Sequence, residues 1–255
     1  MIFALVVLAA ASLYEQSVVR LFAEGFSDTR VSYLFLKTSN GEILGSRWPD
    51  AQRPVAPGSL LKVFTALAYS ETHGGRFPNV VCRGKASGCW LPRGHGEMGI
   101  VQAVAHSCNA YFRALAAELR MEDVRTLALR YGMETPAADA TAESLIGLGK
   151  AWEITPAALA RAYGLLIAEA GAAQVVSGMA ASARTGTGIA AGFGLVKTGT
   201  APCVHRPGAP GDGFVIALYP AEAPRYTLLV RVHGTSGAQA AEVAGRMLRI
   251  LREGR

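Results

Sequence analysis

The sequence predicts an α+β fold in which both ends of the chain contribute strands to one antiparallel sheet and a helical lobe is inserted between them. Strand-like alternation occurs near the N-terminus, three strand-like segments follow residue 195, and the pattern between them is mainly helical. Segregation of strands and helices along the chain is typical of the α+β class. The 255 residues are 51% hydrophobic without a low-complexity tract, enough for one core or two packed lobes.

The first segment is an apolar run, Ile2 to Leu13, which ends in the small residues Ala9-Ala10-Ala11-Ser12. This pattern suits the apolar core and cleavage site of a secretory signal, although no basic residue precedes it. The run is short for a membrane span, and a first helix buried against the domain is the alternative. We assign residues 1–28 to an apolar signal or anchor segment with a leading helix, and residues 29–255 to the main domain.

A β-hairpin and a helix are predicted next. Val31 to Lys37 and Glu42 to Arg47 alternate around Ser39-Asn40-Gly41, which indicates two strands joined by a turn. After Ser59, apolar residues recur at helical spacing and predict a helix in the core between two lobes: Leu60, Val63, Phe64, Leu67 and Ala68.

The remaining chain divides into helices followed by strands. The helical lobe is predicted over residues 72–176 and includes helices at Met98 to Ala105, Ala110 to Arg120 and Ala157 to Ala170. Three strands then follow, with Pro and Gly in their connections, and an amphipathic helix closes the chain. The strands are Leu195 to Thr200, Phe214 to Tyr219 and Tyr226 to Val232, and the helix is Ala238 to Leu251.

Three short motifs, each present once, carry the chemistry: Ser59-Leu60-Leu61-Lys62, Ser107-Cys108-Asn109 and Lys197-Thr198-Gly199-Thr200. A lysine three residues after a serine on a helix lies one turn away, so its amine can reach the hydroxyl and take its proton. Pro57 and Gly58 indicate a sharp start of that helix, which leaves backbone N–H groups free to face an oxyanion.

These motifs, in this order, are those of serine β-lactamases and penicillin-binding proteins, and the chain resembles that superfamily over about residues 31–252. The resemblance implies a β-lactamase/transpeptidase-like fold, with a cleft between sheet and helical lobe, and makes residues 29–255 the catalytic domain. Further stretches similar to penicillin-binding transpeptidase domains are Ser-Cys-Asn-Ala-Tyr-Phe (107–112), Ile-Gly-Leu-Gly (146–149), Ile-Thr-Pro-Ala-Ala-Leu-Ala-Arg-Ala-Tyr (154–163) and Gly178-Met179.

The resemblance implies a substrate, the acyl-D-Ala-D-Ala end of a peptidoglycan stem peptide, with β-lactams as its mimics. Ser59 would attack the carbonyl carbon. Lys62 would be the base, with its pKa lowered by burial and by the charge of Lys197. Ser107 would pass a proton to the leaving amine. Asn109 would orient Lys62 and hold the substrate backbone.

The third motif is expected to bind the substrate. Lys197 and the hydroxyls of Thr198 and Thr200 would hold the terminal carboxylate, and Gly199 would let the substrate lie close to the strand. The backbone N–H groups of Ser59 and Thr200 would form the oxyanion hole. A second basic-Thr-Gly-Thr stretch, Arg184 to Thr187, leads into a Gly- and Ala-rich segment and not into a strand, so Lys197 is preferred. Penicillin-binding domains often carry such a Gly-Thr before the true motif.

The sequence does not distinguish a transpeptidase, which passes the acyl group to an amine, from a DD-carboxypeptidase, which passes it to water. A class D-like β-lactamase is an alternative because the motif spacing is compact, but Asn109 stands where that class carries Val, and Tyr131-Gly132-Met133 departs from its Tyr-Gly-Asn. A β-lactam-binding sensor that stays acylated is a second alternative. Class A is disfavoured because the sequence contains no Glu-x-x-Leu-Asn.

Four cysteines fit an oxidising compartment. Cys82 and Cys89 flank six residues with two glycines, and we expect them to form a disulfide. A metal site with His95 and His106 matches no zinc spacing, so neither a metal nor another cofactor is expected. Cys108 and Cys203 are interpreted as structural.

The net charge of +6 comes from scattered arginines, without a basic run. This pattern does not indicate nucleic-acid binding and is compatible with affinity for anionic envelope surfaces. The resemblance implies an exported protein, periplasmic or on the extracytoplasmic face of the membrane, with possible membrane anchoring. Protein partners stay open.

Overall fold

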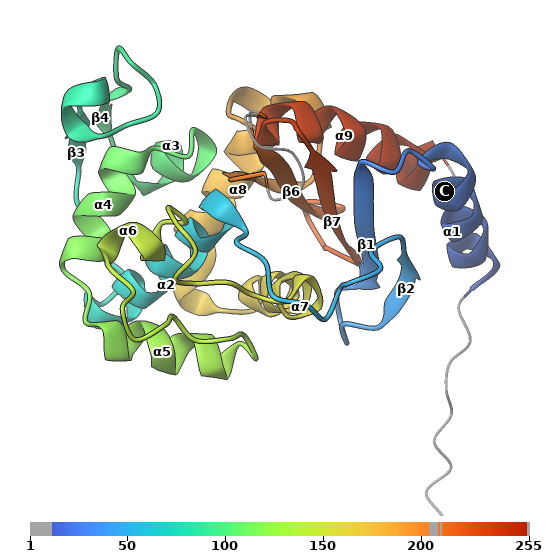
Figure 1. The fold of residues 1–255 in the computed structure, drawn as a ribbon, viewed down its shortest axis with the longest axis horizontal. Coiled ribbons are helices and arrows are strands. Elements are labelled where there is room, and N and C mark those ends of the chain that lie inside the picture. The colour runs from blue at the N-terminus through green and yellow to red at the C-terminus, as the bar shows by residue number, and fades with distance from the viewer. Residues whose placement is uncertain (1–11, 204–208, 210, 254–255) are drawn as a thin grey trace, which may run out of the picture.

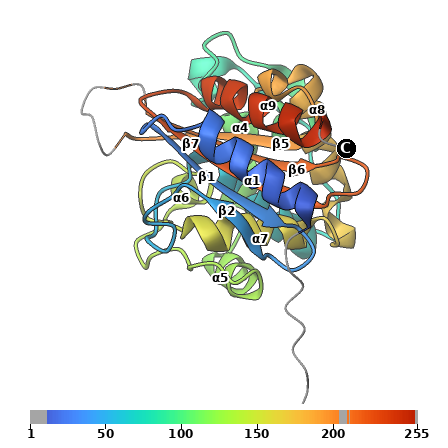
Figure 2. The same ribbon diagram turned by 90° about the vertical axis from the view of Figure 1, so that its right-hand side faces the viewer.

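The computed structural model describes residues 12–203, 209 and 211–253, and its centre is a five-stranded antiparallel sheet. The strand order is β2-β1-β7-β6-β5 (Figures 1 and 2). β1 pairs with β7 along its whole length, with Val31 opposite Val232 and Lys37 opposite Tyr226. The two chain ends therefore share one sheet, as predicted. The bounds are β1 (Val31–Lys37), β2 (Ile43–Ser46), β5 (Leu195–Ala201), β6 (Asp212–Tyr219) and β7 (Tyr226–His233).

Helices cover both faces of this sheet. Figure 2 shows α1 (Leu13–Gly25) and α9 (Gly237–Glu253) crossing one face. Successive side chains of a strand point to opposite faces: Phe35 packs into the core beneath these helices, and Leu34 packs into the core of the helical lobe. Both faces of β6 are therefore buried along its whole length, and six of the seven residues of β1 are buried.

The helices of the lobe surround α2 (Lys62–Thr72), as Figure 1 shows. Almost all side chains of α2 are buried. The other helices of the lobe are α3 (Ile100–Ala105), α4 (Asn109–Ala117), α5 (Met121–Arg130), α6 (Ala142–Leu145), α7 (Pro156–Leu166) and α8 (Ala173–Thr185). Short 3-10 helices are η1 (Gly58–Leu61), η2 (Gly84–Ser87), η3 (Ala170–Ala172) and η4 (Ile189–Ala191). A separate two-stranded sheet, β3 (Val80–Cys82) with β4 (Gly96–Met98), lies at the far end of the lobe.

Several predicted boundaries differ from the structure. The hairpin forms, with a bulge between Phe35 and Leu36. The helix predicted to end at Ala170 ends at Leu166, and η3 follows it. The β3–β4 pair was not predicted because each strand has only three residues, too few for an alternating pattern to stand out.

The apolar run predicted as a signal or anchor lies mostly in residues 1–11, outside the described residues. The leading helix α1 begins with a capping box, in which Ser12 Oγ accepts from Glu15 N–H and Glu15 accepts from Ser12 N–H. Within the described chain, no single helix has the length and hydropathy for a membrane span, although α7 with the segment Ala170–Thr185 passes as a bent pair.

Candidate active site

The first motif lies where a 3-10 turn leads into α2. In a 3-10 helix, residues i and i+3 are eclipsed, so Ser59 in η1 and Lys62 at the start of α2 lie on the same side. The preceding Gly58 has φ of 59°, and a Cβ there would lie 2.3 Å from the carbonyl oxygen of Thr200. Only glycine therefore allows the first motif to pack directly on the strand that carries the third.

Lys62 is fully buried, and its ammonium group is held by the second motif. Nζ donates to the Ser107 carbonyl at 2.8 Å, to Asn109 Oδ1 at 2.5 Å and to Ser107 Oγ at 3.3 Å. These acceptors match the three donors of an ammonium group. Burial lowers the pKa of Lys62 to about 7, so a large fraction of the amine is neutral at neutral pH.

Ser107 has a backbone conformation that is unusual for a residue with a side chain. Its φ of 52° is the only positive value among the described non-glycine residues. Ser107 N–H donates to the Val104 carbonyl and Cys108 N–H to the Ala103 carbonyl, which is the Schellman pattern at the end of α3. Glycine is usual at this position, and serine there costs about 1–2 kcal/mol. Such strain is found where a side chain has a functional role.

Lys197 on β5 is also fully buried, and Nζ donates to Ser107 Oγ at 2.9 Å and to the Thr198 carbonyl at 2.6 Å. Burial, followed by the charge of Lys62, lowers the pKa of Lys197 well below its ordinary value. The expected lowering of the Lys62 pKa by burial is present. The like charges of the two lysines repel each other, which adds to the effect of burial at Lys197.

A cavity of about 350 Å³ connects the three motifs. Ser59, Ser107 and Asn109 line it from the helical lobe, and residues 198–200 line it from β5. The two buried lysines lie behind this lining. All eight predicted site residues are therefore in the cavity wall or directly behind it. The other lining residues are Trp90, Leu148, Thr187, Ser236, Gly237 and Ala238.

Thr187 also lines the cavity, although the stretch Arg184 to Thr187 was not predicted to form part of the site. Its hydroxyl lies 2.6 Å from that of Thr198, and its N–H donates to the Ala105 carbonyl at 3.0 Å. Arg184 lies in the last turn of α8 and is not among the residues that line the cavity, which agrees with the preference for Lys197. The sequence signal for Thr187 is the Gly-Thr pair that penicillin-binding domains often carry before the third motif.

The glycine of the third motif has a packing function. A Cβ on Gly199 would lie 2.6 Å from the Pro57 carbonyl oxygen, so its missing side chain faces η1. The next strand position, Thr200, accepts a hydrogen bond from Gly237 N–H at 2.9 Å. Gly237 in turn lies against the Gly199 backbone, where a Cβ would be 2.3 Å from the carbonyl oxygen. Backbone groups of three separate segments therefore meet at this wall of the cavity.

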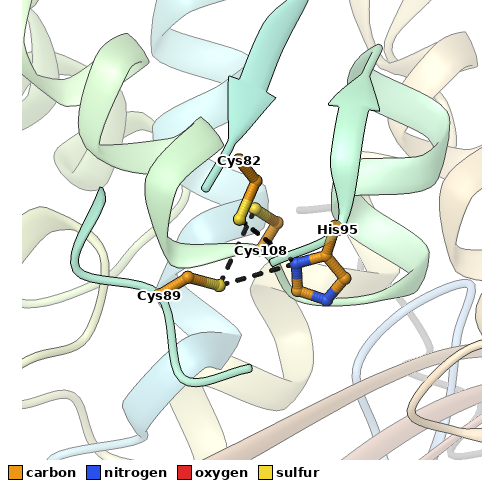
Figure 3. Close-up of side chains that lie close together, drawn as sticks. All are labelled: Cys82, Cys89, His95 and Cys108. Carbon is orange, nitrogen blue, oxygen red and sulfur yellow. Dashed lines mark hydrogen bonds between the residues drawn. The ribbon is translucent and has the colours of Figure 1, made fainter. Parts of the chain in front are cut away.

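The expected disulfide between Cys82 and Cys89 is absent, because both are free thiols in the structure, as is Cys108. Figure 3 shows these three cysteines converging with His95. The sulfurs of Cys82 and Cys89 each lie 3.5 Å from His95 Nδ1, and those of Cys89 and Cys108 are 3.9 Å apart. The spacing of Cys82 and Cys89 suggested a pair, whereas folding adds a third thiol and an imidazole.

A sheet built from both chain ends, a helical lobe and a cleft where the three motifs meet define the β-lactamase-like fold of penicillin-binding domains. The chain belongs to the penicillin binding protein transpeptidase domain family, which its sequence matches over residues 37–251. No curated protein sequence matches it.

Solved structures of the same fold are similar over nearly the whole chain. Pseudomonas aeruginosa PBP2 in complex with WCK 5153 matches with a TM-score of 0.74 and 17% identity, over 95% of this chain and 74% of that one. The transpeptidase domain of the Legionella pneumophila FtsI4 D,D-transpeptidase matches with a TM-score of 0.72 and 17% identity, over 96% and 98%. Helicobacter pylori PBP2, solved with MreC, matches with a TM-score of 0.74 and 16% identity, over 93% of this chain and 63% of that one.

Proposed function

We propose that this protein is an active-site serine acyl-transferase that acts on the D-Ala-D-Ala end of peptidoglycan stem peptides, as a transpeptidase or DD-carboxypeptidase, and that penicillin acylates it. The observation that carries the proposal is that Nζ of Lys197 and Nζ of Lys62 both donate to Ser107 Oγ. These groups lie directly behind the cavity that Ser59 lines. This arrangement offers a nucleophile, a base and a proton path in one place.

In the proposed acylation, Ser59 Oγ bonds to the carbonyl carbon of the penultimate residue while its proton passes to neutral Lys62. The backbone N–H groups of Ser59 and Thr200 stabilise the oxyanion. When the C–N bond breaks, Ser107 gives its proton to the leaving amine and regains one from Lys62, which lies 3.3 Å from its hydroxyl. The products are an acyl-Ser59 ester and free D-Ala. An amine or water then takes the acyl group.

The wall of the cavity formed by β5 supports the binding roles. Thr198 and Thr200 are two residues apart on a strand, so their side chains point to the same side, which suits a carboxylate ligand. Lys197 points to the opposite side and supplies positive charge from behind. Gly199 brings β5 close to η1 and thereby sets the width of the site, instead of letting the substrate lie close to the strand as expected.

The surroundings of Lys62 favour this proposal over a class D-like β-lactamase. A carbamylated lysine of that class needs a dry, apolar pocket. Here Asn109 Oδ1 lies 2.5 Å from Lys62 Nζ and Ser107 contributes two further acceptors. A polar cage of this kind holds an amine or ammonium group. We therefore expect a long-lived penicilloyl-enzyme.

The substrate class also implies an extracytoplasmic location, and we propose that the protein is exported. The proposal includes either a protein released into the periplasm or one anchored at the extracytoplasmic face of the membrane. The Helicobacter pylori relative was solved with MreC, and a partner of that kind is a further candidate for this chain.

Labelling with fluorescent penicillin, followed by mass spectrometry and release kinetics, tests the function. We expect one adduct on Ser59, no labelling of Ser59→Ala, and full labelling of Ser236→Ala, which removes another cavity hydroxyl. Release of D-Ala from a stem pentapeptide should require Ser59. Rapid nitrocefin turnover stimulated by bicarbonate would instead support the β-lactamase. A stable adduct without D-Ala release would support the sensor, and labelling elsewhere would refute the assignment of Ser59.

A further inference from the structure

Four side chains with metal-binding atoms meet at one point beside the active site (Figure 3). Cys82 ends β3, Cys89 follows η2, His95 precedes β4 and Cys108 precedes α4. Their three sulfurs and the His95 nitrogen all lie within 4.8 Å of one another. The cysteines are buried, with exposed fractions of 3%, 5% and 0%.

The distances between these atoms fit a tetrahedral zinc ion. Zinc–sulfur bonds of about 2.3 Å and zinc–nitrogen bonds of about 2.0 Å at tetrahedral angles place two sulfurs about 3.8 Å apart, and sulfur and nitrogen about 3.5 Å apart. The sulfurs of Cys89 and Cys108 are 3.9 Å apart, and the two sulfur–nitrogen distances are both 3.5 Å. The side chains are therefore spaced for a shared ion.

We propose that Cys82, Cys89, Cys108 and His95 bind a structural Zn²⁺ ion through three thiolates and Nδ1. Three thiolates with one imidazole are a preferred ligand set for zinc, and four protein ligands leave no position for substrate. The thiol protons pass to the buffer on binding. The site is separate from the proposed acyl transfer, and it departs from the expectation that the chain binds no metal.

The irregular spacing of the ligands explains why the sequence did not indicate this site. Six residues separate Cys82 from Cys89, five separate Cys89 from His95, and twelve separate His95 from Cys108. The last ligand comes from the start of a helix and not from a second short loop. His106 is not among the four converging residues and makes a ring contact with His95, at 5.8 Å between centroids.

The segment from β3 to β4 has no apolar core of its own, because its buried Cys82, Cys89 and Met98 belong to the core of the helical lobe. Most of its side chains are exposed, including Trp90 at 52% and Val81 at 55%. Its loops nevertheless fold tightly: a Cβ on Gly84 would lie 2.0 Å from the Pro92 carbonyl oxygen, and one on Gly94 would lie 2.3 Å from that of Cys82. A compact segment without an apolar core is typically stabilised by a metal ion or disulfides.

The proposed ion would also hold two parts of the active site. Cys108 stands between Ser107 and Asn109, both of which contact Lys62. Cys89 precedes Trp90, whose Nε1 donates to the Ser107 carbonyl at 3.1 Å. An ion at this point therefore fixes the second motif from both sides and supports the left-handed conformation of Ser107. Its loss is expected to loosen the site as well as the segment.

The first test measures metal in the full-length protein purified under reducing conditions without chelator. We expect about one zinc per chain by inductively coupled plasma mass spectrometry. Replacement by Co²⁺ should give thiolate-to-cobalt charge-transfer bands and the visible bands of tetrahedral cobalt. Cys82→Ser and His95→Ala should lose the stoichiometric ion. Cys203→Ser and His106→Ala, matched controls outside the ligand set, should retain it.

A second measurement remains informative if the ligand variants fail to fold. Chelation of the wild-type protein should lower its melting temperature, and added Zn²⁺ should restore it. Zinc well below one per chain, or no change in melting temperature on chelation and zinc addition, would overturn the proposal, as would a Cys82–Cys89 disulfide in non-reduced material. Because these readouts do not depend on penicillin, failure of the metal site and failure of the acyl-transferase proposal are distinguishable.

Discussion

The ammonium nitrogen of Lys197 lies 2.9 Å from the hydroxyl oxygen of Ser107. Lys62 reaches the same oxygen from the other side at 3.3 Å. Two fully buried amines thus share one hydroxyl. Two ammonium charges so close together in a buried site disfavour each other. The pair is therefore suited to moving a proton through Ser107 and not to carrying two full charges.

The rate of penicillin acylation should rise with pH through about 7. Burial lowers the pKa of Lys62 to about 7, so Lys62 is protonated and unable to act as a base below that pH, and is neutral above it. Acylation rates of the wild-type protein between pH 5 and 9 measure this effect. Lys62→Ala should acylate at least about 100-fold more slowly at pH 8. A wild-type rate independent of pH over this range would contradict the role of Lys62.

Ser107→Gly should be more stable than Ser107→Ala by about 1 kcal/mol. Both variants lose the hydroxyl and its contacts with the two lysines, but only glycine relieves the strain of a φ of 52°. Urea unfolding of the two variants measures the difference, and both should lose D-Ala release. Equal stabilities would show that the left-handed conformation of Ser107 carries no cost.

Thr187→Val should weaken the binding of carboxylate-bearing ligands by about threefold to tenfold, the effect of losing one hydrogen bond of about 1 kcal/mol. The Thr187 hydroxyl lies 2.6 Å from that of Thr198, so its removal frees Thr198 to rotate. The affinity for a stem peptide, measured with Ser59→Ala to prevent turnover, reports this effect. Thr185→Val is the matched control, because that exposed hydroxyl contacts only its own helix. Equal losses in the two variants would argue against a role for Thr187.

Gly58→Ala should destabilise the protein far more than Gly74→Ala. The two glycines have nearly the same φ, 59° and 60°, so the backbone cost of alanine is about 1 kcal/mol for both. Only at Gly58 would the new Cβ meet another chain segment, the Thr200 carbonyl at 2.3 Å, whereas nothing lies within 4 Å at Gly74. Thermal unfolding and penicillin labelling should therefore be impaired at Gly58 alone. Similar melting temperatures for the two variants would contradict this packing argument.

The sheet and the motifs were predictable because their signals are local. Alternation in Val31–Lys37 and the spacing of Ser59 and Lys62 follow directly from strand and helix periodicity. The contact between Thr187 and Thr198 depends on how α8 leads into β5, and the left-handed Ser107 depends on how α3 ends. The meeting of Cys108 with Cys82 depends on the packing of α4 beside β3. Periodicity alone contains none of this information.

The glycine contacts around the cavity have a consequence for inhibitor selectivity. Gly58, Gly199 and Gly237 bring backbone against backbone, and a Cβ at Gly147 would lie only 2.0 Å from the Gly58 carbonyl oxygen. Side-chain substitution cannot reshape this part of the wall without separating the segments that meet there. We therefore expect differences in inhibitor preference between this protein and other members of its family to arise at side chains that line the cavity, among them Trp90 and Leu148. A compound selective for this protein needs a substituent that reaches them.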